Sequence, residues 1–221
     1  MPQLPPIFAP PSLVSFSQSH PLILGSSSEW RRKVLEIAGC SVHSCVSPDI
    51  DEKAIRARTP EEMSMLIARA KAVAVHAKIK DTVSIATSSR LPRIVICSDQ
   101  VAVCDSVVRE KPESEEEARK FIASYSSGSP VSTVTALVVS DLVSGRTAEG
   151  THTATVKFKP ISEASIDKLV KGRVVYTCCG GFSVDDPEMG KWVEKIEGGV
   201  DSVMGLPLCL LSDLIEQVIS E

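Results

Sequence analysis

Apolar and polar positions alternate along this chain with two periods, one typical of strands and one typical of helices. Short apolar runs at 22–24 and 94–97 predict two buried strands. The Val- and Thr-rich stretch 131–139 predicts a third strand, and alternation over 151–157 predicts a paired strand after the turn residues 141–145. Because the later strands have hairpin character, the pattern favours a mixed sheet over a purely parallel one.

The clearest helical signal begins at Thr59, which can cap a helix that continues with Pro60 and completes a capping box with Glu62. Apolar residues then recur at helical spacing as far as Ala77. Lys71 lies one position beyond an apolar residue, so we expect it at the border of the buried stripe. Further helices are predicted over 34–38, from Ser114 onward, over 162–171 and over 207–219, whereas 81–93 and 173–206 are predicted to be irregular.

Length and charge restrict the class of protein. The chain has 221 residues, enough for one large domain or two small lobes. Its net charge of −4 argues against a nucleic-acid-binding protein, and no apolar run approaches the roughly 18 residues of a membrane span. Residues 1–20 contain no charged side chain other than a histidine and match neither a signal nor a transit peptide. We therefore expect a flexible extension over 1–20 and a cytoplasmic domain over 21–221.

Cysteine and histidine spacing gives little support to a metal or disulfide site of the common kinds. The seven cysteines include no C-x-x-C pair, so buried free thiols in a reducing compartment are expected. The four histidines form no H-E-x-x-H motif. A histidine-based metal site and a histidine-activated nucleophile therefore have no support.

A turn of small residues between the first strand and the next helix is the most informative local feature. Gly25 is followed by three serines, including Ser26 and Ser28, and then by Trp30 and Arg31. Such a turn can present backbone N–H groups to an anion at the positive end of a helix, and Arg31 adds fixed charge there. An ordinary serine-capped surface helix explains the same residues about equally well.

Charged residues near strand ends and turns supply the remaining candidate chemistry. The chain has neither a P-loop nor a G-x-S-x-G nucleophile turn. Asp99 follows the 94–97 strand, a position where α/β sheets bind ligands. Cations bind phosphate oxygens, and carboxylates hold Mg²⁺ or accept a proton from water. Each residue alone is more commonly a surface ion-pair member, but together they suit phosphoanhydride hydrolysis: Arg31, Asp51, Glu52, Lys71, Asp99 and Lys111.

Several of these segments occur in the order seen in one protein family. From about residue 21 to 215 the chain resembles the Maf family of nucleotide pyrophosphatases. The matching segments are Leu24-Gly25-Ser26-Ser27-Ser28-Glu29-Trp30-Arg31-Arg32, Asp49-Ile50-Asp51-Glu52, Ala70-Lys71-Ala72, Ser98-Asp99-Gln100-Val101, Lys111-Pro112 and Met204-Gly205-Leu206-Pro207-Leu208. Several motifs in order over nearly 190 positions make the resemblance specific.

The resemblance implies an α/β fold with an elongated mixed sheet flanked by helices, and two lobes with a cleft, as in inosine triphosphate pyrophosphatase-like proteins. It implies cleavage of a nucleoside triphosphate between the α and β phosphates with a divalent cation, Mg²⁺, Mn²⁺ or Co²⁺. It makes Asp99 the proton acceptor and places Glu52 and Asp99 near the metal. Phosphate binding is assigned to Ser26, Ser28, Arg31, Lys71 and Lys111. By analogy with relatives, a homodimer is expected.

Within that family, three residues resemble the branch that acts on 7-methyl-GTP. Trp30 offers an aromatic face to the cationic 7-methylguanine base, and Gln100 replaces the Thr usual in dTTP- and UTP-directed members. Asp185 stands where this branch has a Glu that could accept the guanine N–H groups. Alternatively, Trp30 is a packing residue and Asp185 a solvated loop acid.

Two departures from the family pattern keep other functions open. Glu110 replaces the usual Gly before Lys111, and the residues around Asp185 differ from the family loop. A dTTP- or UTP-type pyrophosphatase is one alternative. A nucleotide-binding regulator that has lost catalysis is another.

Overall fold

The computed structural model describes residues 4–80 and 93–220 and divides the chain into two compact units. The major unit comprises Ile7–Asp99, Thr135–His152 and Gly205–Glu221, and the minor unit comprises Met1–Pro6, Gln100–Val134 and Thr153–Met204. Apart from Arg93, the stretch expected to be irregular over 81–93 lies outside the described residues.

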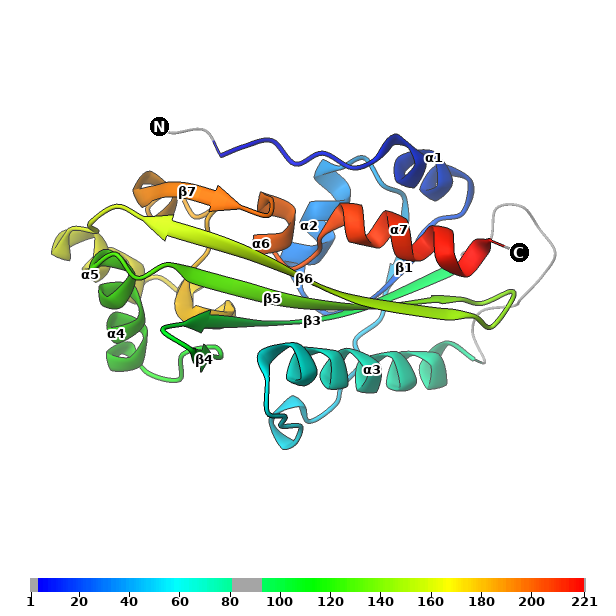
Figure 1. Cartoon of the computed structure of the whole chain (residues 1–221), viewed down its shortest axis with the longest axis horizontal. Coiled ribbons are helices and arrows are strands. Elements are labelled where there is room, and N and C mark those ends of the chain that lie inside the picture. The colour runs from blue at the N-terminus through cyan, green and yellow to red at the C-terminus, as the bar shows by residue number, and fades with distance from the viewer. Residues whose placement is uncertain (1–3, 81–92, 221) are drawn as a thin grey trace. The chain divides into compact units, whose positions relative to one another are not determined.

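The described strands form one mixed sheet in the order β2-β1-β3-β5-β6-β7, with β4 paired to β3 (Figure 1). β1 runs parallel to β2 and β3, whereas β4 is antiparallel to β3 and β7 is antiparallel to β6. This confirms the mixed sheet predicted from the sequence. The bounds are Leu22–Gly25 (β1), Val42–Cys45 (β2), Ile94–Cys104 (β3), Val107–Arg109 (β4), Val131–Asp141 (β5), Thr147–Phe158 (β6) and Val193–Glu197 (β7).

Four of the α-helices within the described residues begin at a side chain that caps them. The side chains of Ser28, Thr59, Ser114 and Ser162 each accept a hydrogen bond from the backbone N–H three residues later. The α-helices are Pro11–Ser19 (α1), Glu29–Ile37 (α2), Pro60–Ile79 (α3), Glu115–Ser126 (α4), Glu163–Lys171 (α5), Val200–Val203 (α6) and Leu208–Ile219 (α7). None of the helices within 4–80 and 93–220 combines the length and apolarity that a bilayer crossing requires.

In the major unit, α3 lies against one face of the strands. Its buried residues Ala68, Ala72 and Val75 form one cluster with Ile23 of β1 and with apolar residues of β3 and β5. Figure 1 shows α7 on the opposite side of these strands from α3. The predicted helix is confirmed, but its buried face differs from the predicted stripe: Leu66 and Ala77 are exposed, whereas Ala68, Lys71 and Ala72 face the sheet.

The N-terminal residues differ from the expected extension, because 11–19 form α1. Leu13 is buried, and the Ser12 hydroxyl lies 3.3 Å from that of Ser212 in α7. Ser17 is also buried, and its Oγ accepts a hydrogen bond from the Ser41 N–H. The prediction of a flexible segment over 1–20 is therefore wrong for the helical residues 11–19. These residues pack through Leu13, Ser12 and Ser17, which show no amphipathic pattern in the sequence.

All seven cysteines are free, as their spacing indicated, but they are not all buried. Cys40, Cys97 and Cys104 are buried, whereas Cys45 and Cys209 are exposed. Burial raises the pKa of the Cys97 thiol to about 12, so this side chain acts as a small apolar group beneath the Gly25 turn.

An ion pair joins the beginning of β3 to the end of β5 in the major unit. The Arg93 guanidinium donates to both carboxylate oxygens of Asp141, each at 2.7 Å. Burial alone would raise the pKa of Asp141, but bonds from Arg93, Ser144 and the Val143 N–H outweigh it and lower this pKa to about 2. The carboxylate is therefore more stable as an anion in the folded protein than in the unfolded chain.

This lowered pKa predicts a stability contribution that depends on pH. The contribution is fully present above the unfolded pKa near 4 and is lost as pH falls toward 2, because the unfolded carboxyl takes up its proton first. We expect Asp141→Asn to cost about 2 kcal/mol at pH 7, with the difference from wild type shrinking between pH 4 and pH 2. Urea unfolding across that range measures it. Asp213→Asn, at an exposed position of α7, is the control, and a pH-independent difference for Asp141→Asn would contradict the prediction.

Candidate active site

Asp99 lies inside β3 rather than beyond its end, which corrects the sequence-based placement. The strand continues to Cys104 because apolar residues resume after Gln100. The neighbouring parallel strand β1 stops earlier, with Gly25 opposite Cys97. Asp99 therefore follows the end of the β1 pairing and stands beside the turn that leads into α2, with only 5% of its surface exposed.

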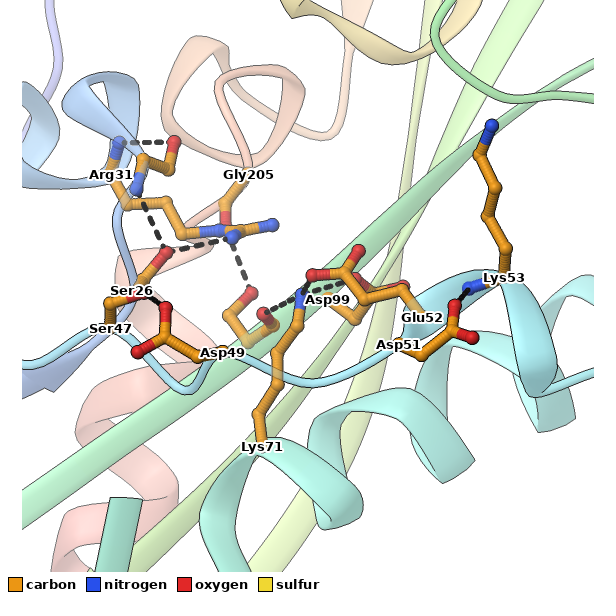
Figure 2. Close-up of polar contacts among 12 residues, drawn as sticks. Ser26, Arg31, Ser47, Asp49, Asp51, Glu52, Lys53, Lys71, Asp99 and Gly205 are labelled. Atoms are coloured by element: carbon orange, nitrogen blue, oxygen red, sulfur yellow. Dashed lines mark hydrogen bonds and ion pairs between the residues drawn. The ribbon is translucent and has the colours of Figure 1, made fainter. Parts of the chain in front are cut away.

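Lys71 brings the two candidate acids together. Its Nζ lies 2.7 Å from the Asp99 Oδ1 and 2.9 Å from the Glu52 Oε1, and 3.5 Å from the Ser98 carbonyl oxygen (Figure 2). The side chain of Lys71 is only 5% exposed, so it is buried rather than at the border of the helix stripe. A buried ammonium requires such partners, and its three N–H groups meet three acceptors here.

The buried setting alters the acidity of Asp99. Burial raises the pKa of this carboxyl above its ordinary value, Lys71 and Arg31 oppose the rise, and Glu52 adds to it. A carboxylate with a raised pKa holds a proton more readily, which is the property that a general base needs. Because Arg31 acts on Asp99 through space, the cation of α2 and the acid of β3 belong to one electrostatic site.

Ser26, Ser28 and Arg31 form a connected turn at the beginning of α2. The Arg31 Nη1 donates to the Ser26 Oγ at 3.1 Å, and the same oxygen accepts from the Ser28 N–H at 3.1 Å. The Ser28 hydroxyl caps α2 by accepting from the Arg31 N–H at 3.5 Å. The serine-capping interpretation is therefore correct for the Ser28 side chain.

Gly205 orients Arg31, a role that the sequence analysis did not assign. Its carbonyl oxygen accepts from the Arg31 Nε at 3.0 Å and from the buried Ser98 hydroxyl at 3.1 Å (Figure 2). The backbone at Gly205 has φ of +92°, which favours glycine. The Met204-Gly205-Leu206-Pro207 motif was the available signal, but only the folded chain shows that this carbonyl meets Arg31.

Of the acids in the segment before α3, Glu52 contacts Lys71 and Asp51 does not. The Asp51 carboxylate accepts from the Lys53 N–H at 3.1 Å and caps the short 3₁₀ helix Glu52–Ala54. Lys78 donates to the Ser47 carbonyl at 2.8 Å and pairs with Asp49. Asp51 thus has a local structural role, and Glu52 is the acid of this segment that contacts Lys71.

The acids at Lys71 fit a cation that needs few protein ligands. Within the described residues, no group of three or more His, Cys, Asp or Glu side chains could enclose a metal ion. Mg²⁺ commonly binds through one or two carboxylates, water and substrate phosphates. Glu52 and Asp99 supply two carboxylates around one positive centre, so they suit this mode rather than a closed cage.

The other residues predicted for the site are Trp30, Gln100, Lys111 and Asp185. Trp30 is partly exposed at the first turn of α2, with the Lys33 Nζ 5.5 Å from its ring centroid. Lys111, Gln100 and Asp185 belong to the minor unit. Gln100 Nε2 donates to the Ser202 carbonyl oxygen at 2.8 Å, and Asp185 accepts from the Ser183 hydroxyl. The major unit brings together Ser26, Ser28, Arg31, Glu52, Lys71 and Asp99.

Comparisons with known proteins identify the family of this chain. Residues 21–218 match the family described as Maf-like protein. A 7-methyl-GTP pyrophosphatase of Dictyostelium discoideum is 45% identical over 202 residues, which cover 90% of this chain and 98% of that protein. Proteins of the same name from Idiomarina loihiensis and Pseudomonas syringae pv. tomato are 30% and 31% identical, over 88% of this chain and 93% and 94% of theirs.

Proposed function

Because this chain belongs to the Maf family of nucleotide pyrophosphatases, we propose that it hydrolyses 7-methyl-GTP to 7-methyl-GMP and pyrophosphate. The observation that carries the proposal is the Lys71 ammonium held between Asp99 and Glu52, with Arg31 acting on the same carboxyl. This is an acid whose raised pKa suits proton transfer, set among cations that suit a polyphosphate.

In the proposed reaction, Asp99 accepts a proton from the attacking water. The water oxygen bonds to the α phosphorus while the bond from that phosphorus to the bridging oxygen breaks, and pyrophosphate departs with the bridging oxygen. Arg31, Lys71 and the N–H groups at the beginning of α2 stabilise negative charge on the phosphates. Lys111 is proposed as a further phosphate ligand.

We infer that Glu52 and Asp99 would hold a divalent cation, Mg²⁺, Mn²⁺ or Co²⁺. Such a cation neutralises phosphate charge and orients the reacting groups. Lys71 already pairs with both carboxylates, so it balances their charge and keeps them close.

Base preference is proposed to depend on Trp30 and Asp185, with Gln100 as a further specificity residue. The Lys33 ammonium over the Trp30 ring shows that a face of this indole meets a cation in the fold. A cationic 7-methylguanine would gain about 2 kcal/mol on such a face when desolvated. Asp185, oriented by Ser183, would accept hydrogen bonds from the guanine edge.

A substrate panel tests this preference directly. We expect pyrophosphate release from 7-methyl-GTP to exceed that from GTP, dTTP and UTP with each of the three metals. Trp30→Ala should reduce the preference for 7-methyl-GTP over GTP by about 5–30-fold, because the cation–π contribution is lost. Trp30→Phe, which keeps an aromatic face, should retain most of it. A panel led by dTTP or UTP would refute the proposed substrate.

The alternatives predict different results in the same panel. A dTTP- or UTP-type enzyme would release pyrophosphate from those substrates first. A regulator without catalysis would bind triphosphates tightly and release no pyrophosphate. Glu110 before Lys111 and the altered loop around Asp185 suggested this alternative. The cytoplasmic location and the homodimer stay predictions.

A further inference from the structure

Both backbone polar groups of Gly180, five residues before Asp185, make hydrogen bonds to other parts of the chain. The Gly180 N–H donates to the Glu110 carbonyl at 3.0 Å, and the Gly180 carbonyl accepts from the Tyr125 hydroxyl at 2.7 Å. Gly180 and Gly181 both have positive φ, +70° and +66°, a backbone conformation that favours glycine. All of these residues belong to the minor unit.

The same turn has almost no free space around it. A Cβ on Gly180 would lie 2.7 Å from the Ala102 Cβ, and one on Gly181 would lie 3.3 Å from the Pro112 Cγ. The turn therefore packs directly on β3 and on the Lys111-Pro112 segment. Close packing of this kind transmits a displacement of the turn to its neighbours.

Tyr125 is itself held rigidly. It is fully buried, and the Arg109 guanidinium lies 5.0 Å from its ring centroid while donating to the Ser124 Oγ at 2.6 Å. Phe182, the residue after the turn, packs edge-on against Tyr125 with ring centroids 5.7 Å apart. The hydroxyl thus reaches Gly180 from a ring that has little freedom to move.

Lys111 follows Glu110, whose carbonyl oxygen bonds to Gly180, and Asp185 follows Gly181 by four residues. Burial is the main cause of the raised pKa of Cys178, but Asp185 also raises that pKa and Lys111 lowers it. Both charges therefore act on one thiol two residues before Gly180. The Gly180 turn is thus bonded to the residue before Lys111, and it precedes Asp185 in the chain by five residues.

We propose that Tyr125 is a positioning residue for base recognition, because its hydroxyl holds the Gly180 turn and so sets the place of Asp185 relative to Lys111. This rests on the roles given above to Asp185 and Lys111. Tyr125 does not touch the substrate in this scheme. Its loss should alter which triphosphate binds well rather than the chemical step at Asp99.

Tyr125→Phe tests the proposal, because it removes the hydroxyl and keeps the ring. We expect the ratio of kcat/KM for 7-methyl-GTP over GTP to fall about 5–10-fold, which corresponds to the net loss of one hydrogen bond. The change should appear in KM for 7-methyl-GTP, with kcat within about twofold. Amide hydrogen exchange at Gly180 and Gly181 should become faster in the same variant.

Tyr176→Phe is the matched control. The Tyr176 hydroxyl also donates to a backbone carbonyl, that of Val170 at 2.8 Å, but this bond is made to the end of α5 and involves neither Gly180 nor Gly181. The control should keep the wild-type ratio. Should Tyr125→Phe unfold, Arg109→Met, which keeps the hydroxyl but frees the ring, is expected to lower the ratio as well.

Two results would overturn the proposal: an unchanged ratio in folded Tyr125→Phe, or an equal fall in Tyr176→Phe. A wrong substrate assignment would be recognised separately, because the wild type would then favour another triphosphate. In that case the ratio of kcat/KM is measured for the favoured triphosphate over the next best. For a protein without turnover, the ratio of dissociation constants is measured instead. Tyr125→Phe must still lose that preference for the proposal to stand.

Discussion

Asp99→Asn is expected to lower the rate of pyrophosphate release by about 10²–10⁴-fold, the usual contribution of a positioned general base. The amide keeps the size of the side chain but does not accept a proton from water at neutral pH. Lys71 keeps its contact with Glu52, so we expect the variant to stay folded. Release from 7-methyl-GTP, followed in single-turnover and steady-state assays, measures the loss.

Asp213→Asn provides the matched control, because it makes the same chemical change at an exposed site of α7. It should retain wild-type turnover. If Asp99→Asn keeps its turnover within a few fold of wild type while binding the triphosphate normally, another group accepts the proton. The proposed mechanism would then be lost even if the substrate preference held.

Lys71→Met is expected to have the largest effect on stability. The substitution keeps much of the aliphatic volume but leaves Asp99 buried without its cation. Removing one partner of a buried ion pair typically costs about 3–5 kcal/mol. Urea unfolding at pH 7 should show this loss, and turnover should fall as well because Lys71 is also a proposed phosphate ligand.

Lys78→Met makes the same change two helical turns later on α3, where the lysine pairs with Asp49 at the surface. Little change in stability is expected there, because exposed pairs are screened by water. Adding Asp99→Asn to Lys71→Met should recover part of the lost stability, since the unpaired buried charge is removed. Equal effects of the two lysine substitutions would show that burial of the Lys71 pair does not matter.

Local chemistry explains which parts of the fold were predictable. Thr59 and Ser114 mark helix starts through bonds that span three residues, so the sequence alone contains them. The short strands β2, β4 and β7 were missed because neighbouring strands stabilise them rather than their own apolar pattern. β3 was predicted too short, since its polar centre resembles a strand end until β4 is seen to pair with 102–104.

The candidate site was predictable to a similar extent. The family and the mixed sheet are confirmed, and Lys71, Asp99 and Glu52 do meet. Which acid before α3 reaches Lys71 depends on the Asp51 cap, which only the folded backbone reveals. The contacts of Gly205 and Tyr125 join residues more than 50 positions apart, so no local pattern contains them. The individual roles of the site residues stay predictions.

The lysine between Glu52 and Asp99 has a consequence for the resting enzyme. Two acids held close together would ordinarily repel each other and loosen the loop before α3 until an external ion arrived. Here the chain carries its own counter-charge, so the pocket is already assembled between turnovers. If turnover needs the proposed divalent cation, a chelator should stop pyrophosphate release without lowering the free energy of unfolding.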